Sequence, residues 1–208
     1  MSNSYTTLWT NNLCRNLERS GHAGRRLTMM FGGPHKSLPS FERAGVRPGD
    51  RIFPIRVLRT RLYVLGVMEV SRVIPYEDAG SELHDDDYTK LLDWRPLKAG
   101  CVTEVLLGPP GSPLAFDQVV PADLLERLTF TSARRGDRTL KYVEDGILTR
   151  STSLHGIYRL AAHSAAELSQ LVMMGGPSAG RPAPSFRPLE SDGKPSGMSA
   201  IKPEAARS

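Results

Sequence analysis

The residue types that can hold a nucleic-acid base lie close together near the start of the chain. A base needs a flat aromatic ring to stack on, an amide to pair with its edge and a cation for its phosphate. An aromatic residue, two amides and two arginines fall within 18 positions: Trp9, Asn11, Asn12, Arg25 and Arg26. This grouping favours a base-contacting site. The alternative is that Trp9 packs in the core and the two asparagines cap the following helix.

A larger set of basic residues surrounds the segment 47–74 and occupies two loops. Its members are Lys36, Arg43, Arg47, Arg51, Arg56, Arg59 and Arg61, together with Arg134, Arg135 and Arg138 of the sequence SARRGDR. At the ends of strands, such side chains can contact a phosphate backbone without disturbing the core. Taken singly, each is better explained as a solvated surface charge. Taken together, they predict one basic face.

The charge of the chain is unevenly distributed along its length. The 208 residues contain 27 Lys and Arg and 22 Asp and Glu, a net charge of +5. Residues 1–75 hold 12 basic and 4 acidic side chains, whereas residues 76–125 hold 3 and 10. This distribution is typical of a protein with one basic surface that faces phosphates and an acidic surface that does not bind them. The excess of arginine over lysine, 21 to 6, is also what a GC-rich coding sequence produces.

Motifs for metal, nucleotide and nucleophilic chemistry are incomplete. The segment 108–112, GPPGS, lacks the Gly-Lys-Ser/Thr that a phosphate-binding loop needs before its helix. The segment 84–87, HDDD, is interpreted as an exposed acidic loop rather than a metal site. Cys14 and Cys101 have neither zinc-ligand nor disulfide-framework spacing. His155 is expected on a strand, bonded to backbone, rather than acting as a general base. We therefore expect no catalytic residue, metal or cofactor.

The elements that must position these residues follow from apolar periodicity and from turn signals. We expect strands at 5–10, 52–57, 62–70, 101–107, 139–143 and 154–160, with a bend at Gly66. Helices are expected at 11–20, 121–128 and 164–173, with Ser164 capping the last and Glu167 completing a capping box. Residues 21–39 are expected to form a mobile basic loop.

These elements predict an α+β fold, a small mixed pseudo-barrel of five to six strands flanked by short helices. Residues 1–174 form the domain, and residues 175–208, rich in Pro, Gly, Ser and Ala, are expected to be a disordered tail. Neither a membrane span nor a secretory signal is readable, so a cytoplasmic protein is expected.

Two neighbouring segments carry a family resemblance. The turn at 45–51, GVRPGDR, and the returning strand at 62–70, LYVLGVMEV, resemble the G-(V/I)-x-x-G-D turn and G-x-x-x-V strand of PUA-like barrels, which include EVE, ASCH and YTH modules. The resemblance implies a pseudo-barrel that binds RNA or DNA, in several members by enclosing a modified or flipped base. It places Trp9 and Asn11 or Asn12 at the mouth of a pocket, opposite the loop 33–37. Trp94, Phe31 and Phe53 do not provide an identifiable second aromatic wall.

The function expected from the sequence is a non-enzymatic module that binds RNA or DNA. The alternative is a protein-interaction module that binds a basic partner through the acidic segment 76–93 or through the tail. A small-molecule enzyme that uses His155 or Cys14 is the third class. It would require a deep pocket around one of these side chains.

Overall fold

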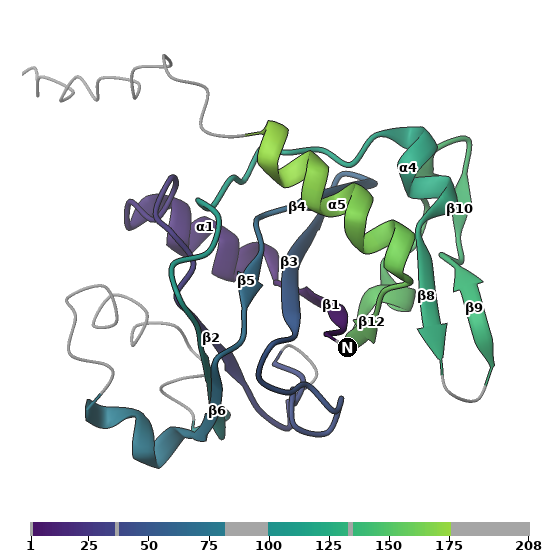
Figure 1. The fold of residues 1–208 in the computed structure, drawn as a ribbon. Coiled ribbons are helices and arrows are strands. Elements are labelled where there is room, and N and C mark those ends of the chain that lie inside the picture. The colour runs from purple at the N-terminus through teal and green to yellow at the C-terminus, as the bar shows by residue number, and fades with distance from the viewer. Residues whose placement is uncertain (1, 36–37, 82–99, 133–134, 176–208) are drawn as a thin grey trace, which may run out of the picture. The chain divides into compact units, whose positions relative to one another are not determined.

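The structure is a computed structural model, and it describes residues 2–35, 38–81, 100–132 and 135–175 (Figure 1). The strands are β1 (Ser4–Leu8), β2 (Met29–Gly32), β3 (Arg51–Leu58), β4 (Arg61–Val64), β5 (Met68–Glu69), β6 (Arg72–Pro75), β7 (Glu104–Leu107), β8 (Thr129–Ser132), β9 (Gly136–Thr139), β10 (Val143–Glu144), β11 (Ile147–Leu148) and β12 (Ile157–Arg159). The helices are α1 (Asn11–Arg19), α4 (Ala122–Arg127) and α5 (Ala162–Met174), with 3-10 turns η1 (Tyr76–Ser81) and η2 (Thr152–Leu154). Within these ranges, no helix is both long and apolar enough to cross a bilayer.

The strands form several sheets rather than a barrel. In the largest sheet the order is β12, β1, β3 and β4, and β5 also pairs with β3. A second sheet has the order β2, β7 and β6, while β8–β9 and β10–β11 are separate two-stranded ribbons. The fold is therefore mixed α+β as expected. The closed pseudo-barrel is not found, because the described strands do not join into one ring.

The two faces of β3 separate the core into two parts. Phe53 and Ile55 point to one face, where Leu168 of α5 and Leu125 of α4 complete a cluster of buried side chains. Ile52 belongs to the cluster on the opposite face, together with Cys14 of α1. This alternation is the period of two of a β-strand. Figure 1 shows α5 in front of β3, and helix α1 contacts the same strand.

A break in the second half of the hairpin coincides with a proline and a glycine. β4 pairs with residues 55–58 of β3 and β5 with residues 51–52, so Pro54 faces the gap between them. Proline has no N–H to donate, and at position 54 neither β4 nor β5 lies opposite to accept one. Gly66 lies in the interruption between β4 and β5 and has a φ of 155°. The expected strand 62–70 is therefore two short strands, with Gly66 between them.

The turn that carries the family resemblance is held by one carboxylate. Asp50 is buried, and its two oxygens accept from the backbone N–H of Asn3 at 2.7 Å and of Arg47 at 2.9 Å. Gly45 and Gly49 have φ of 78° and 88°, which favours glycine at both ends of the turn. Asp50 therefore ties the chain before β1 to the start of β3.

The last helix begins differently from the expectation. Ala161 is its N-cap residue and provides no side-chain cap. The Ser164 hydroxyl instead accepts from the Thr129 N–H at 3.0 Å, and Glu167 accepts from Nε of Arg127 at 2.8 Å. The capping box is wrong because both side chains are used in contacts to the segment around α4 and β8.

Three other expectations need correction. The loop 21–39 contains β2, which pairs with β7 in the second sheet. The strand expected at 139–143 lies earlier, as β9, and pairs with β8, which the pattern missed. The strand expected at 154–160 is confined to β12, because residues 152–154 form η2. Of the tail 175–208, residues 176–208 lie outside the described residues, as does the segment 84–87.

Candidate nucleic-acid interface

A pocket opens where β1 ends and α1 begins. It has a volume of about 400 Å³, and Leu8, Trp9, Thr10, Asn11, His35, Val57, Ser151 and His155 line it. We call it the Trp9 pocket. The Trp9 N–H donates to the Ile55 carbonyl at 2.8 Å, which extends the parallel pairing of β1 and β3 by one residue. This bond holds the half-buried indole at the pocket wall.

Thr10 turns the chain from the strand into the helix. Its hydroxyl accepts from the Leu13 N–H at 3.2 Å, so Thr10 is the N-cap of α1. The alternative reading, in which Asn11 and Asn12 cap the helix, is wrong. Because Thr10 and Asn11 line the Trp9 pocket, the N-terminus of α1 adjoins it. This helix end has a partial positive charge, and no acidic residue in the first turn offsets it.

Asn11 lines the Trp9 pocket with an amide that is already oriented by two bonds. Its Oδ1 accepts from Nε of Arg56 at 2.9 Å, and its Nδ2 donates to the Val57 carbonyl at 3.2 Å. An amide nitrogen carries two hydrogens, and this bond uses one of them. Asn12, in contrast, is not in the pocket lining, and its Oδ1 accepts from Arg15 at 2.6 Å.

Arg56 lies on the face of β3 that packs against α1. Its side chain is 6% exposed and forms an ion pair with Glu18 at 3.3 Å. The period of two that puts Ile52 on this face also puts Arg56 there. Arg56 is therefore a buried structural residue rather than part of an exposed basic face.

The lining of the Trp9 pocket also includes two histidines and a serine. His35 follows β2, as expected for the loop 33–37, whereas Ser151 and His155 come from the segment before β12. His155 lies in a bend and not on a strand, which corrects the sequence-based expectation. Its carbonyl accepts from the Tyr158 hydroxyl at 3.0 Å, and the Tyr158 ring meets Phe130 edge to face at 6.0 Å.

A second hollow adjoins the first and shares both histidines with it. Its volume is about 530 Å³, and its lining is Gly33, Pro34, His35, Pro39, Ser40, Arg43, Ala44, His155, Gly156 and Ile157. We call it the Arg43 hollow. Arg43 is exposed, and among the predicted basic residues that the structure describes it is the one that lines this hollow.

One buried carboxylate organises the wall that carries Arg43. Glu104 of β7 is 5% exposed, and its carboxylate accepts from the backbone N–H groups of Phe41 and Glu42 and from the Ser40 hydroxyl. Gly33 completes this wall at a point where a Cβ would fall against the Cys101 carbonyl. Close packing therefore requires glycine at position 33.

The other predicted arginines do not line these two hollows. Arg25 and Arg26 come before β2, whereas His35 follows it, and Arg26 donates to the Gly111 carbonyl at 3.0 Å. Arg47 is exposed on the turn held by Asp50. Lys36 and Arg134 lie outside the described residues.

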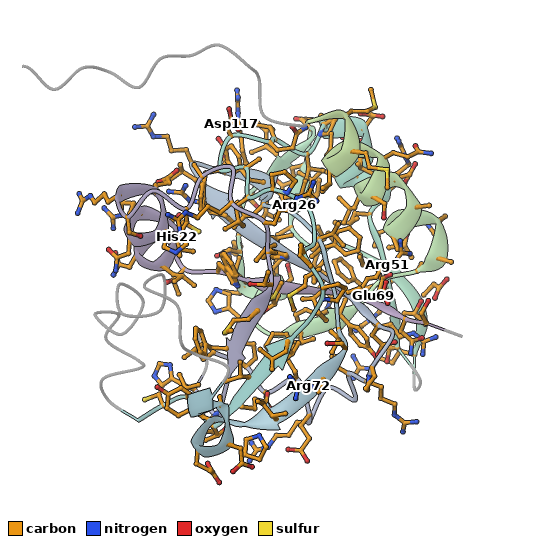
Figure 2. The ribbon with its side chains drawn as sticks, turned by 60° about the vertical axis from the view of Figure 1, so that its left-hand side comes forward. His22, Arg26, Arg51, Glu69, Arg72 and Asp117 are labelled. Carbon is orange, nitrogen blue, oxygen red and sulfur yellow. The ribbon has the colours of Figure 1, made fainter. Side chains whose placement is uncertain are left out.

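Arg51 and the arginines of the hairpin tip lie in other surroundings. Arg51 faces Glu69 across the β3–β5 pair, as Figure 2 shows, and reaches Ser169 of α5 at 3.4 Å. Arg59 and Arg61 line a separate hollow of about 730 Å³ that Asp145 also lines. Arg135 is exposed in the connection from β8 to β9, and Arg138 is exposed on β9.

The aromatic residues considered for a second wall lie elsewhere. Phe53 is fully buried in the core, and Phe31 meets Tyr76 edge to face at 6.4 Å. Trp94 lies outside the described residues. Besides Trp9, the residues with rings that line the Trp9 pocket are therefore His35 and His155. The sequence signal that could have placed His155 in the pocket is its position among hydroxyl residues. The sequence pattern instead predicts a strand at this histidine.

The residues considered for nucleophilic, nucleotide and metal chemistry have packing contacts that explain them. Burial raises the pKa of the Cys14 thiol to about 12, an effect that Arg56 partly opposes. The segment 108–112 packs on the β4–β5 bend, where the Ser112 hydroxyl accepts from the Val67 N–H at 2.8 Å. Within the described ranges, no three His, Cys, Asp or Glu side chains are grouped as metal ligands.

Comparison with known proteins gives distant likenesses. No family model matches the chain, and no curated protein matches it. A hypothetical protein from Leishmania major aligns with 84% of this chain and 96% of its own, at 11% identity and a TM-score of 0.41. A mutant of the ZmASCH protein from Zymomonas mobilis aligns with 81% of this chain and 95% of its own, at 11% identity and a TM-score of 0.39.

Proposed function

We propose that this chain is a non-enzymatic, PUA-like nucleic-acid-binding module that takes one base of an RNA or DNA strand into the Trp9 pocket. The observation that carries the proposal is the composition of that pocket. An indole, a fixed amide and two imidazole rings surround about 400 Å³ of space. Stacking surfaces and hydrogen-bonding groups of these kinds are what base recognition uses.

The roles of the residues follow from their contacts. Trp9 offers the stacking surface, and Asn11 offers the amide hydrogen that its bond to Val57 does not use. Arg43 lies in the adjoining hollow, where a phosphate can be neutralised. The N-terminus of α1 adds partial positive charge on the same side. The remaining residues of the predicted set are assigned to the rest of the strand, outside the pocket: Asn12, Lys36, Arg25, Arg26, Arg47, Arg51, Arg59, Arg61, Arg134 and Arg135.

The experiment is fluorescence-anisotropy binding of the full chain to labelled 12-nucleotide RNA and DNA, single-stranded and duplex, at two salt concentrations. We expect tighter binding to a single strand, because its bases are available to the pocket. The logarithm of the affinity should fall with that of salt, with a slope of about −0.7 for each neutralised phosphate.

A pair of variants tests the role of the pocket. Trp9→Ala should weaken single-strand binding by about 5- to 100-fold, since stacking on an aromatic ring contributes about 1–3 kcal/mol per base. Trp9→Phe keeps a ring and should recover much of the affinity. If Trp9→Ala folds, by circular dichroism, and binds as tightly as the wild type, the proposal is wrong.

A further inference from the structure

We propose that the Arg43 hollow holds the nucleotide next to the base in the Trp9 pocket, so that the ligand is a single strand of at least two nucleotides. This inference rests on the proposed function and assigns a neighbouring subsite. The two hollows are neighbours, since His35 and His155 line both of them. The two imidazoles therefore stand at the boundary between the subsites.

The two linings differ in polarity, as a base and a linking phosphate do. Leu8, Trp9 and Val57 give the first an apolar and aromatic wall. The second contains the guanidinium of Arg43 and the hydroxyl of Ser40. No acidic residue lines either hollow within the described residues. A phosphodiester carries one negative charge, which a guanidinium can bind through two parallel hydrogen bonds.

The combined size exceeds the need of one base. The hollows measure about 400 Å³ and about 530 Å³. Each lies within the range of about 300–1,000 Å³ that is usual for a complete ligand site. A nucleoside in the Trp9 pocket would leave the Arg43 hollow empty, whereas the second nucleotide of a dinucleotide would enter it.

Hydrogen bonds to the backbone fix parts of the walls around the two hollows. Tyr158 donates to the carbonyl of His155, which lines both hollows. Glu104 binds the backbone N–H groups of residues 41 and 42, directly before Arg43. Walls fixed in this way do not have to be ordered when a ligand binds, which preserves affinity.

The test measures how well small competitors displace a labelled single-stranded RNA 12-mer from the full chain. The competitors are adenosine and the dinucleotide ApA, with the deoxy forms run in parallel on a DNA 12-mer. For the wild type, we expect ApA to compete at least about tenfold better than adenosine, since one charge-assisted contact to phosphate accounts for about that factor. Arg43→Gln should reduce this preference to about twofold and leave adenosine unchanged. It should also lower the salt slope of 12-mer binding by about 0.7.

Arg19→Gln is the matched control, because Arg19 is an exposed arginine of α1 outside both linings. It should keep the full preference for ApA. Equal competition by adenosine and ApA, while the 12-mer still needs Trp9, would overturn the inference and leave the proposed function standing. The same follows if Arg43→Gln and Arg19→Gln have equal effects. A 12-mer that does not bind at all, or that binds independently of Trp9, refutes the proposed function itself.

Discussion

The guanidinium of Arg56 holds the amide of Asn11 at 2.9 Å, and thereby fixes one wall of the Trp9 pocket from inside the fold. Arg56 also pairs with Glu18 at 3.3 Å. One buried side chain of β3 thus connects two positions of α1, at its first turn and near its end. The pocket amide is therefore oriented before any ligand arrives.

Arg56→Met tests this arrangement. Methionine keeps much of the apolar stem but removes both polar contacts, so the free energy of unfolding should fall by about 1–3 kcal/mol. Urea denaturation followed by circular dichroism measures the change. Glu18→Gln is the control and should cost less than about 1 kcal/mol, because the Glu18 side chain is 39% exposed and reaches water. Equal losses in the two variants would contradict the account.

The two cysteines should differ in reactivity. Cys14 is fully buried and burial raises its pKa to about 12, whereas Cys101 is half-buried. The thiolate is the reactive form, so at pH 8 iodoacetamide should modify Cys101 and leave Cys14 intact until the protein is unfolded. Mass spectrometry of the alkylated chain counts the adducts. Modification of Cys14 in the folded protein at the rate of Cys101 would show that α1 does not seal it.

The same pKa shift implies a pH dependence of stability. The folded pKa of Cys14, about 12, lies above the ordinary thiol value of 9.0, so folding favours the neutral thiol. This contribution is fully present below about pH 9 and is lost as the pH rises toward 12. Urea midpoints between pH 8 and pH 11 should therefore fall less for Cys14→Ala than for the wild type. A parallel decline in the two proteins would contradict this expectation.

Gly33→Ala should disturb the Arg43 hollow. The added Cβ would meet the Cys101 carbonyl oxygen, which belongs to the backbone and cannot move aside easily. We expect a loss of about 1–3 kcal/mol in the free energy of unfolding. Gly80→Ala is the matched control, since a Cβ at Gly80 meets nothing within 4 Å, and its effect should stay within about 0.5 kcal/mol. Wild-type stability in Gly33→Ala would show that the wall is looser than described.

The tip of the β3–β4 hairpin should accept a more favourable turn. Arg59 and Thr60 have φ of 48° and 64°, a conformation that suits Asn-Gly in a two-residue hairpin loop. Replacing both, Arg59→Asn with Thr60→Gly, should stabilise the protein by about 1 kcal/mol and raise Tm by about 2–4 °C. Calorimetry gives the shift. A lower Tm would mean that the side chains removed stabilise the tip more than the turn strains it.

The apolar pattern predicted the elements that carry the core. The runs around Ile52 and Leu62, the helix beginning at Asn11 and the bend at Gly66 were all readable, because their periodicity and turn chemistry are local. β2 was missed for a physical reason. Gly32 and Gly33 suggest a loop, but here their small size is required by close packing against Glu104 of β7 and against Cys101 in the segment before β7. Sequence spacing alone does not show such contacts.

The candidate site was predicted in part. Trp9, Asn11 and the loop that contains His35 were expected to meet, and all three line one pocket. The contribution of His155 was missed because it depends on the pairing of β12 with β1, from opposite ends of the described chain. Arg56 was grouped with surface charges, although its alternation with Ile52 on β3 places it inside.

The place of β1 in its sheet has a consequence for the order of folding. Thr7 pairs with Pro54 on one side and with Ile157 on the other, so β1, the first strand of the described residues, is an inner strand of its sheet. Until the ribosome has released residue 157, one edge of β1 is without its partner strand. Such long-range pairing slows folding, and until it forms the open sheet edge must be kept from associating with other chains.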